Sequence, residues 1–96
     1  MNIDIKAVHF TLEKDSRDYL DRKIGRIHNA ENMIVDLIFS FKKEKTYKAE
    51  AKVNFRWGVS IHVAEDDFEL NAAIDKMMDK LEAKISKEKE KVKEKR

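Results

Sequence analysis

The sequence predicts an α+β fold with the order β-α-β-β-β-α, in which two helices pack on one face of a four-stranded mixed sheet. Apolar and polar residues alternate without interruption over residues 46–55, which is typical of a strand with one buried face. Apolar residues recur at helical spacing in two longer segments, one on each side of this strand region. Proline is absent and glycine occurs only at Gly25 and Gly58, so long regular elements joined by short turns are expected.

The first strand and the first helix are predicted near the N-terminus. Ile3 and Ile5 alternate with polar neighbours, which predicts a strand over residues 1–7 with one buried face. The Thr11 hydroxyl can accept a hydrogen bond from the free N–H groups at a helix start. Apolar residues follow it at helical spacing, so a helix is expected over residues 12–28.

Three further strands are predicted in the middle of the chain. After a break at residues 29–32, residues 33–41 are rich in apolar and β-branched types, and this composition favours a strand. The alternating residues 46–55 form the next strand. Gly58 marks a hairpin turn, and residues 59–63 alternate again as the fourth strand.

The second helix is expected to run from about Asp67 into the nineties. Asp66 is a candidate cap, and Glu69 three residues later completes a capping box that suits the positive end of a helix. Residues 86–96 form a Lys/Glu-rich extension of this helix. A chain of 96 residues leaves little room for a second core, so residues 1–96 are interpreted as a single domain.

The order of elements also predicts the topology of the sheet. A helix between the first two strands implies a parallel pair joined by a right-handed crossover, and the short connections that follow imply an antiparallel meander. Both helices are expected on the same face, where they cover the apolar side of the third strand.

Composition narrows the functional classes. Lys and Arg number 21 against 19 Asp and Glu, and the net charge of +2 alone indicates no particular partner. Cysteine is absent, which excludes disulfides and thiolate metal sites. No apolar run approaches the roughly 20 residues of a membrane span, and the N-terminus lacks signal-peptide features. A cytoplasmic protein without a membrane partner is therefore expected.

Motifs of catalysis or metal binding are not recognisable. No Gly-rich phosphate loop, nucleophile motif or enzymatic carboxylate pair occurs, so no catalytic residue, cofactor or small-molecule substrate is expected. His9, His28 and His62 are widely spaced and form no ligand motif. The acids at residues 65–67 could suggest magnesium, but capping of the following helix explains them better.

The second helix carries the strongest functional signal. At about 100° per residue, its apolar residues form one stripe, and its acids and lysines gather on two other faces. The acidic face contains Asp75, Asp79, Glu82 and Glu90. The cationic face contains Lys76, Lys80, Lys84, Lys87 and Lys91.

Two interpretations of this cationic face are open. A Lys/Glu-rich helix often only solvates itself, but such a helix usually mixes its charges in i,i+4 pairs. Here the lysines are largely separated from the acids, which costs electrostatic energy. A row of lysines is easier to explain if it meets a regular array of negative charge such as the phosphates of RNA.

At the level of motifs, the sequence resembles the hibernation promoting factor and ribosome-associated inhibitor family. The resemblance covers nearly the whole chain and is strongest in the second helix. That helix contains Ala72-Ala73-Ile74-Asp75, then Asp79-Lys80-Leu81, then Lys87, Lys89 and Lys91. In the first helix the matching residues are Arg17, Tyr19, Lys23, Ile24, Arg26 and Ile27. The chain departs from the family pattern at Ser16, Asn71 and Ala83.

The resemblance implies a β-α-β-β-β-α fold and a function. Family members bind the decoding region of the small ribosomal subunit, where they block messenger RNA and transfer RNA and silence translation in idle cells. A monomer away from the ribosome is expected. The implied contacts to ribosomal RNA are Lys23, Arg26, Lys80, Lys87, Lys89 and Lys91, and the helical wheel adds Lys76 and Lys84.

Two other functions remain possible at this point, and the role of Trp57 is undecided. The fold could serve a general double-stranded RNA-binding domain, because a sheet with two helices on one face suits recognition of a duplex by shape. It could also serve a protein-interaction module that uses Lys48, Glu50 and Lys52 on the open face of the sheet. Trp57 could stack on an RNA base or could pack on the core after Phe55.

Overall fold

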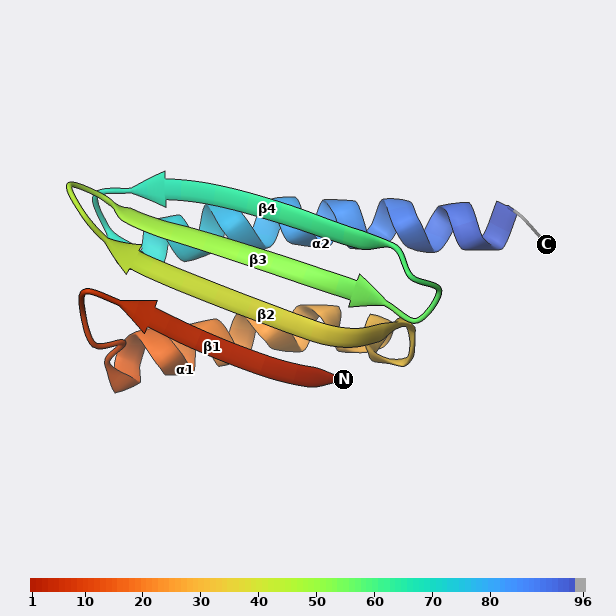
Figure 1. Cartoon of the computed structure of the whole chain (residues 1–96), viewed down its shortest axis with the longest axis horizontal. Coiled ribbons are helices and arrows are strands. Elements are labelled where there is room, and N and C mark those ends of the chain that lie inside the picture. The colour runs from red at the N-terminus through yellow and green to blue at the C-terminus, as the bar shows by residue number, and fades with distance from the viewer. Residues whose placement is uncertain (95–96) are drawn as a thin grey trace.

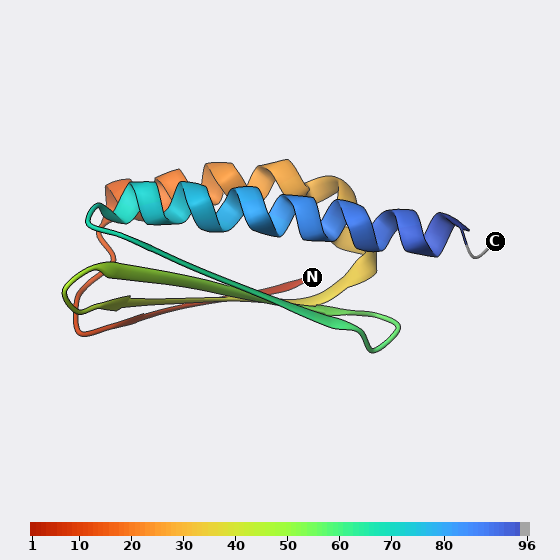
Figure 2. The same ribbon diagram turned by 90° about the horizontal axis from the view of Figure 1, so that it is seen from above.

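A mixed four-stranded sheet carries both helices on one face (Figures 1 and 2). The structure is a computed structural model that describes residues 1–94, and their side chains as far as residue 92. Its elements follow the predicted order, which is confirmed. They are β1 (Asn2–Val8), α1 (Lys14–Ile24), the 3₁₀ segment η1 (Gly25–Met33), β2 (Ile34–Lys43), β3 (Tyr47–Phe55), β4 (Ser60–Asp67) and α2 (Leu70–Glu94).

The strand order in the sheet is β1-β2-β3-β4. β1 and β2 are parallel, and the two later pairs are antiparallel, as predicted. The register places Ile5 beside Phe39, Phe39 beside Ala51, and Ala51 beside Val63. These side chains form one row across the face that the helices cover.

The core lies between this face and the helices. α2 lies over β3 and β4, where Ala49 and Ala51 are fully buried and their small side chains allow a close approach. The bulky Met77, Met78 and Leu81 of α2 are also fully buried. Packing at the density of protein interiors fixes the rotation of α2 about its axis, and therefore the directions of its charged faces.

The edge strand β1 is less covered than predicted. Ile5 is half-buried, and Ile3 is exposed although it occupies the same face. Their partners on β2, Leu37 and Phe39, are fully buried, so burial decreases from β2 to the edge strand and the buried face expected for β1 is only partly formed.

The first helix starts later than predicted. α1 begins at Lys14, and the residue before it, Glu13, makes no side-chain cap. Thr11 is therefore not the cap. His9 adopts a positive φ of 68°, and the chain turns there before residues 10–13 lead into the helix. The cap was misassigned because a turn at a histidine leaves no recognisable sequence signal.

The expected break at residues 29–32 is replaced by 3₁₀ helix. The α-helical part ends at Ile24, and η1 continues to Met33. Ile24, Ile27 and Ala30 are buried and lie three residues apart. A 3₁₀ helix has three residues per turn, so this spacing keeps all three side chains on the core side.

Contrary to the prediction, the second helix is not capped by Asp66, and it starts later, at Leu70. β4 continues to Asp67, and Asp66 lies inside the strand opposite Lys48. Instead, the Asp67 carboxylate accepts a hydrogen bond from the Glu69 N–H at 3.0 Å. The extension predicted from residue 86 is helical as far as Glu94, and its last residues, 95–96, lie outside the described residues. No helix in the described part of the chain is long and apolar enough to cross a membrane.

Candidate nucleic-acid interface

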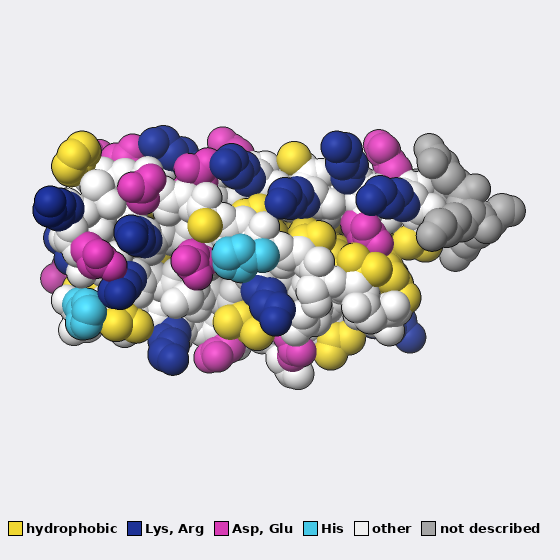
Figure 3. All heavy atoms as spheres, turned by 45° about the horizontal axis from the view of Figure 1, so that its top comes forward, with side chains coloured by type: hydrophobic (Ala, Val, Ile, Leu, Met, Phe, Trp, Pro, Cys, Tyr) yellow, Lys and Arg dark blue, Asp and Glu magenta, His cyan; other side chains and the backbone are white. Residues whose placement is uncertain are grey.

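Side chains of Lys and Arg follow α2 along the side that faces the outer edge of β4 (Figure 3). We call Lys76, Lys80, Lys84, Lys87 and Lys91 the lysine row. All of them are exposed. The apolar stripe of α2 is held against the sheet, and successive members of the row are three or four residues apart, so they share one side of the helix.

The first three lysines of the row contact β4. Lys76 Nζ lies 2.9 Å from the carboxylate of Asp67. Lys84 Nζ donates a hydrogen bond of 3.1 Å to the carbonyl oxygen of His62. Lys80 forms an ion pair with Glu65. These ammonium groups cover an exposed strand edge, which discourages pairing with another strand.

The ion pair between Lys76 and Asp67 at the start of the row shifts the pKa values of both groups. The hydrogen bond with Asp67 raises the pKa of Lys76. The pKa of Asp67 is lowered, mainly by the Glu69 N–H and next by Lys76. Half of the Lys76 side chain is exposed, and exposed pairs contribute at most about 1 kcal/mol. Phosphate can therefore replace the carboxylate at little cost.

The β4 partners of these lysines were not predicted from the sequence, although its pattern contains a signal for them. Ile61, Val63, Glu65 and Asp67 alternate along β4. Since successive side chains of a strand point to opposite faces, the two acids point toward the helices like Val63. Only the position of α2, which the register and packing determine, shows that lysines meet them.

The second half of the row faces a stretch without acids. Residues 56–64 contain no Asp or Glu, and they form the β3–β4 turn and the first part of β4. Lys87 and Lys91 lie on the part of α2 beside this turn. Unlike Lys76 and Lys80, these two lysines therefore face no acid on β4 or on the β3–β4 turn.

The predicted basic residues of the first helix lie on the other side of α2. Lys23 Nζ is 3.0 Å from the Asp75 carboxylate, to which the Tyr19 hydroxyl also donates a hydrogen bond. The Lys23 side chain is only 15% exposed. Asp75 and Lys76 are neighbours, yet one contacts α1 and the other β4. The structure thus separates Lys23 from the lysine row, while Arg26 is exposed on η1.

The Asp75 cluster links the two helices electrostatically. The hydrogen bond from Tyr19 is the main cause that lowers the pKa of Asp75, and Lys23 lowers it further. The same contacts with Asp75 raise the pKa of both Tyr19 and Lys23. Lys23 therefore joins α1 to α2, and this contact leaves it less free for RNA than the exposed lysines.

Lys89 does not belong to the lysine row. It is half-buried, and helical geometry turns it about 200° away from Lys87 and from Lys91. The eight predicted RNA contacts therefore divide into the row, the pair Lys23 and Arg26, and Lys89 alone.

Trp57 packs on the core and is also partly open. Its ring stacks on Phe55 with 5.2 Å between centroids, and its Nε1 donates a hydrogen bond of 2.9 Å to the carboxylate of Glu88. These contacts agree with the packing interpretation of this residue. Even so, the side chain remains 40% exposed.

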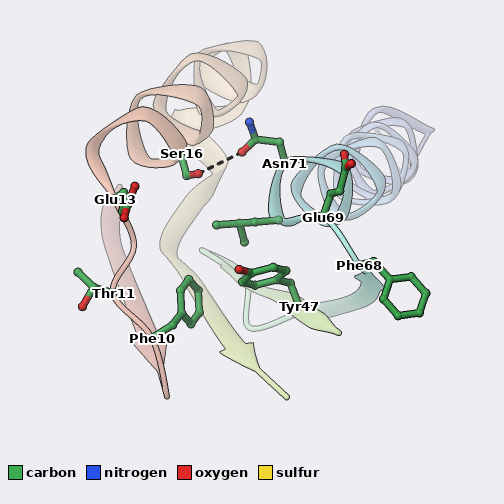
Figure 4. A pocket seen from close by; sticks show the side chains of 9 residues that line it. Phe10, Thr11, Glu13, Ser16, Tyr47, Phe68, Glu69 and Asn71 are labelled. Atoms are coloured by element: carbon green, nitrogen blue, oxygen red, sulfur yellow. Dashed lines mark hydrogen bonds between the residues drawn. The ribbon is translucent and has the colours of Figure 1, made fainter. Parts of the chain in front are cut away.

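A groove lies at the end of the protein opposite Trp57, between the starts of α1 and α2 (Figure 4). Phe10 and Tyr47 contribute aromatic rings to it, and the Ser16 hydroxyl donates a hydrogen bond of 3.2 Å to Asn71 Oδ1 across it. Two of the three departures from the family pattern therefore contact each other. Glu13 and Glu69 also line this groove, and their charge is unfavourable for phosphate.

Groups suited to hold a metal ion are absent from the described residues, where no three His, Cys, Asp or Glu side chains converge. The acids near the start of α2 are instead committed to contacts within the protein. Asp67 accepts the Glu69 N–H just before α2, and Asp66 accepts a hydrogen bond from the Thr46 hydroxyl at 3.2 Å.

Comparisons with known proteins add an independent observation. A family model described as sigma 54 modulation protein / S30EA ribosomal protein matches residues 3–93. A ribosome hibernation promoting factor of Pseudomonas putida is 32% identical over 92 residues, which cover 95% of this chain and 89% of that protein.

Two solved structures are similar in fold. A ribosomal subunit interface protein from Coxiella burnetii superposes with a TM-score of 0.84 at 23% identity, over 93% of this chain and 98% of that one. The N-terminal domain of Thermus thermophilus Protein Y superposes with a TM-score of 0.78 at 26% identity, over 91% of this chain and 98% of that one.

Proposed function

Because the chain belongs to the sigma 54 modulation protein / S30EA ribosomal protein family, we propose that it is a ribosome hibernation factor. In this proposal it binds the decoding region of the small ribosomal subunit and excludes messenger RNA and transfer RNA. The observation that carries the proposal is the lysine row, which presents exposed charge along one side of α2. The name of the Pseudomonas putida relative supports the same function.

The mechanism is occlusion without chemistry. The protein is elongated, with extents of 45 × 20 × 20 Å, and α2 runs along its length (Figure 1). A rigid body of this shape can fill a channel that single-stranded RNA would otherwise occupy. Lysine contacts to phosphate supply affinity and orientation, while fit to the folded RNA surface supplies specificity.

The ion pairs with β4 are compatible with this role. Lys76 and Lys80 are already held by ion pairs with Asp67 and Glu65, so less side-chain entropy is lost on binding. Lys87 and Lys91 face no acid on β4 and are the strongest candidates for direct phosphate contacts. Arg26 is an exposed candidate on the side of η1.

The proposal is tested by competition for the small subunit. Labelled messenger RNA is bound to isolated small subunits, and increasing amounts of the protein are added. The wild-type protein should displace the messenger RNA in a dose-dependent manner. Lys87→Glu combined with Lys91→Glu should weaken displacement at least about tenfold, because two phosphate contacts are replaced by repulsion.

The matched control is Lys48→Glu combined with Lys52→Glu, which makes the same charge change on the open face of the sheet. Both lysines are exposed, and this variant should displace messenger RNA nearly like the wild type. A loss in the Lys48/Lys52 variant but not in the Lys87/Lys91 variant would place the contact on the open face, as a protein-interaction module would. An equal loss in both variants would contradict a specific contact through the lysine row. Undisturbed messenger RNA at saturating protein would contradict occlusion.

A further inference from the structure

A hollow opens between the β3–β4 turn and the last turns of α2. On one side it is lined by Trp57, Val59, Glu88, Lys91 and Val92. On the other side it is lined by Asn32, Met33, Arg56, Trp57 and Val92. Trp57 and Val92 belong to both sides, so the indole borders both parts of the hollow. Hydrophobic side chains are visible at this end of Figure 3, between α2 and the turn.

The indole in this hollow is held in place from two directions. Phe55 is buried and covers one face of the ring at a 15° interplanar angle. Glu88, only 9% exposed, accepts the hydrogen bond from Nε1. Trp57 lines both sides of the hollow and is 40% exposed, so exposed area of the indole borders the open space. The ring is therefore ordered before any ligand arrives, which lowers the entropy cost of stacking.

The charge around the indole is suited to an anionic ligand. Lys91 stands on one side of the hollow, and Arg56 stands on the other, where its Nη1 donates to the Asn32 carbonyl oxygen at 3.1 Å. Among the described residues that line the hollow, Glu88 is the one acid, and its carboxylate accepts the indole N–H. An aromatic surface between two cations is a typical site for a base of single-stranded RNA with its phosphates.

We propose that this hollow binds one unpaired RNA base, which stacks on Trp57 while the neighbouring phosphates contact Lys91 and Arg56. The inference rests on the proposed function, because it requires an RNA partner. The lysine row is proposed to contact phosphates alone. The hollow would add a second kind of contact, which requires an unpaired base. Stacking of this kind is tolerant of sequence.

The chain contains a single tryptophan, so its intrinsic fluorescence reports on this hollow directly. The purified protein is titrated at low salt with a single-stranded adenosine hexamer. A second titration uses an abasic hexamer, which has the same number of phosphates and no bases. The adenosine hexamer should quench the fluorescence saturably, and the abasic one should leave it nearly unchanged. Equal quenching by both, or none by either, would overturn the inference.

Substitutions test the same site by a second readout, the anisotropy of a labelled adenosine hexamer. Trp57→Ala should weaken binding roughly 5- to 100-fold, as expected for the loss of one stacked base, and Trp57→Phe should recover part of it. Phe68→Ala is the matched control, because Phe68 is an aromatic residue with 78% exposure at the other end of the protein. Circular dichroism and thermal melting verify that each variant is folded.

The two proposals fail in different ways. If the protein does not displace messenger RNA, the hibernation function is contradicted. The base site can still be confirmed or overturned by the hexamer titrations. Hexamer binding that is equally strong in Trp57→Ala and in the wild type would overturn the base site, even if displacement of messenger RNA is observed.

Discussion

At the scale of single residues, Asp75 shows how a charged side chain can belong to the architecture. It lies on α2, accepts a hydrogen bond from Tyr19 and pairs with Lys23. The family resemblance predicted that Lys23 contacts RNA. Its partner in the structure, Asp75, lies far along the chain, and no local sequence pattern could indicate this pair. A second such contact joins Ser16 and Asn71 through a hydrogen bond. Both residues depart from the family pattern, and in the sequence these two departures looked independent.

The Asp75 cluster predicts a pH dependence. Because the pKa of Asp75 is lower in the folded protein than in the unfolded chain, its contribution to stability is complete above the unfolded value of about 3.9. That contribution is lost as the pH falls through the folded pKa. Asp75→Asn, which keeps an acceptor for Tyr19, should therefore lower the free energy of unfolding at pH 7 by roughly 0.5–1 kcal/mol.

Urea unfolding at pH values from 7 down to 3 measures this difference. The gap between wild type and Asp75→Asn should shrink as the pH falls. Other carboxylates with lowered pKa, such as Asp67 and Glu44, affect both proteins alike and cancel in the comparison. A gap that stays constant over this range would mean that the charge of Asp75 contributes nothing.

At the scale of elements, periodicity predicted which segments are helix and strand but not all of their ends. The alternation in β3 and the apolar stripe of α2 are long and regular, so both were recognised. The 3₁₀ segment η1 was missed because buried residues at three-residue spacing also fit an α-helix over a short stretch. The end of β4 was misplaced because its last residues are acids, which also suit a helix cap.

The two glycines of the chain predict opposite effects of substitution. Gly25 has a helical φ of −56°, and an added Cβ would meet nothing within 4 Å. Gly25→Ala should raise the free energy of unfolding by about 0.4–1 kcal/mol. Gly58 has a φ of 87°, which strains any other residue, so Gly58→Ala should lower it by about 1 kcal/mol.

Chemical denaturation of the two variants beside the wild type measures both effects. Each substitution adds one methyl group, so each serves as the control for the other. A loss of stability in Gly25→Ala would contradict this expectation. It would show that the junction of α1 and η1 requires a backbone conformation that alanine adopts less easily than glycine.

At the scale of the whole molecule, the sheet orients the charges of α2. The helical wheel predicted three faces of this helix, and packing of Met77, Met78 and Leu81 determines where each face points. Asp75 of the acidic face contacts α1, and the lysine row points toward the edge of β4. Sequence alone could identify the row, but its neighbours Glu65 and Asp67 follow from the register of β4 against β3.

The hollow at Trp57 also depends on the whole fold. The residue lies in the β3–β4 turn, and its partner Glu88 lies 31 positions later on α2. The alternation of β3 predicted that Trp57 could continue the core after Phe55. It could not predict that the end of α2 would pass beside the indole and leave part of it open.

The most direct test of the central claim is sedimentation of the protein with isolated small ribosomal subunits over a salt series, with an RNA duplex as competitor. We expect cosedimentation that survives the duplex and weakens as salt rises, with a slope of roughly −3 to −5 in a plot of log affinity against log salt. Lys87→Gln combined with Lys91→Gln should reduce the slope by about 1.5 to 2. Removal of the protein by the duplex would indicate a general duplex binder, and absence of cosedimentation even at low salt would contradict ribosome binding.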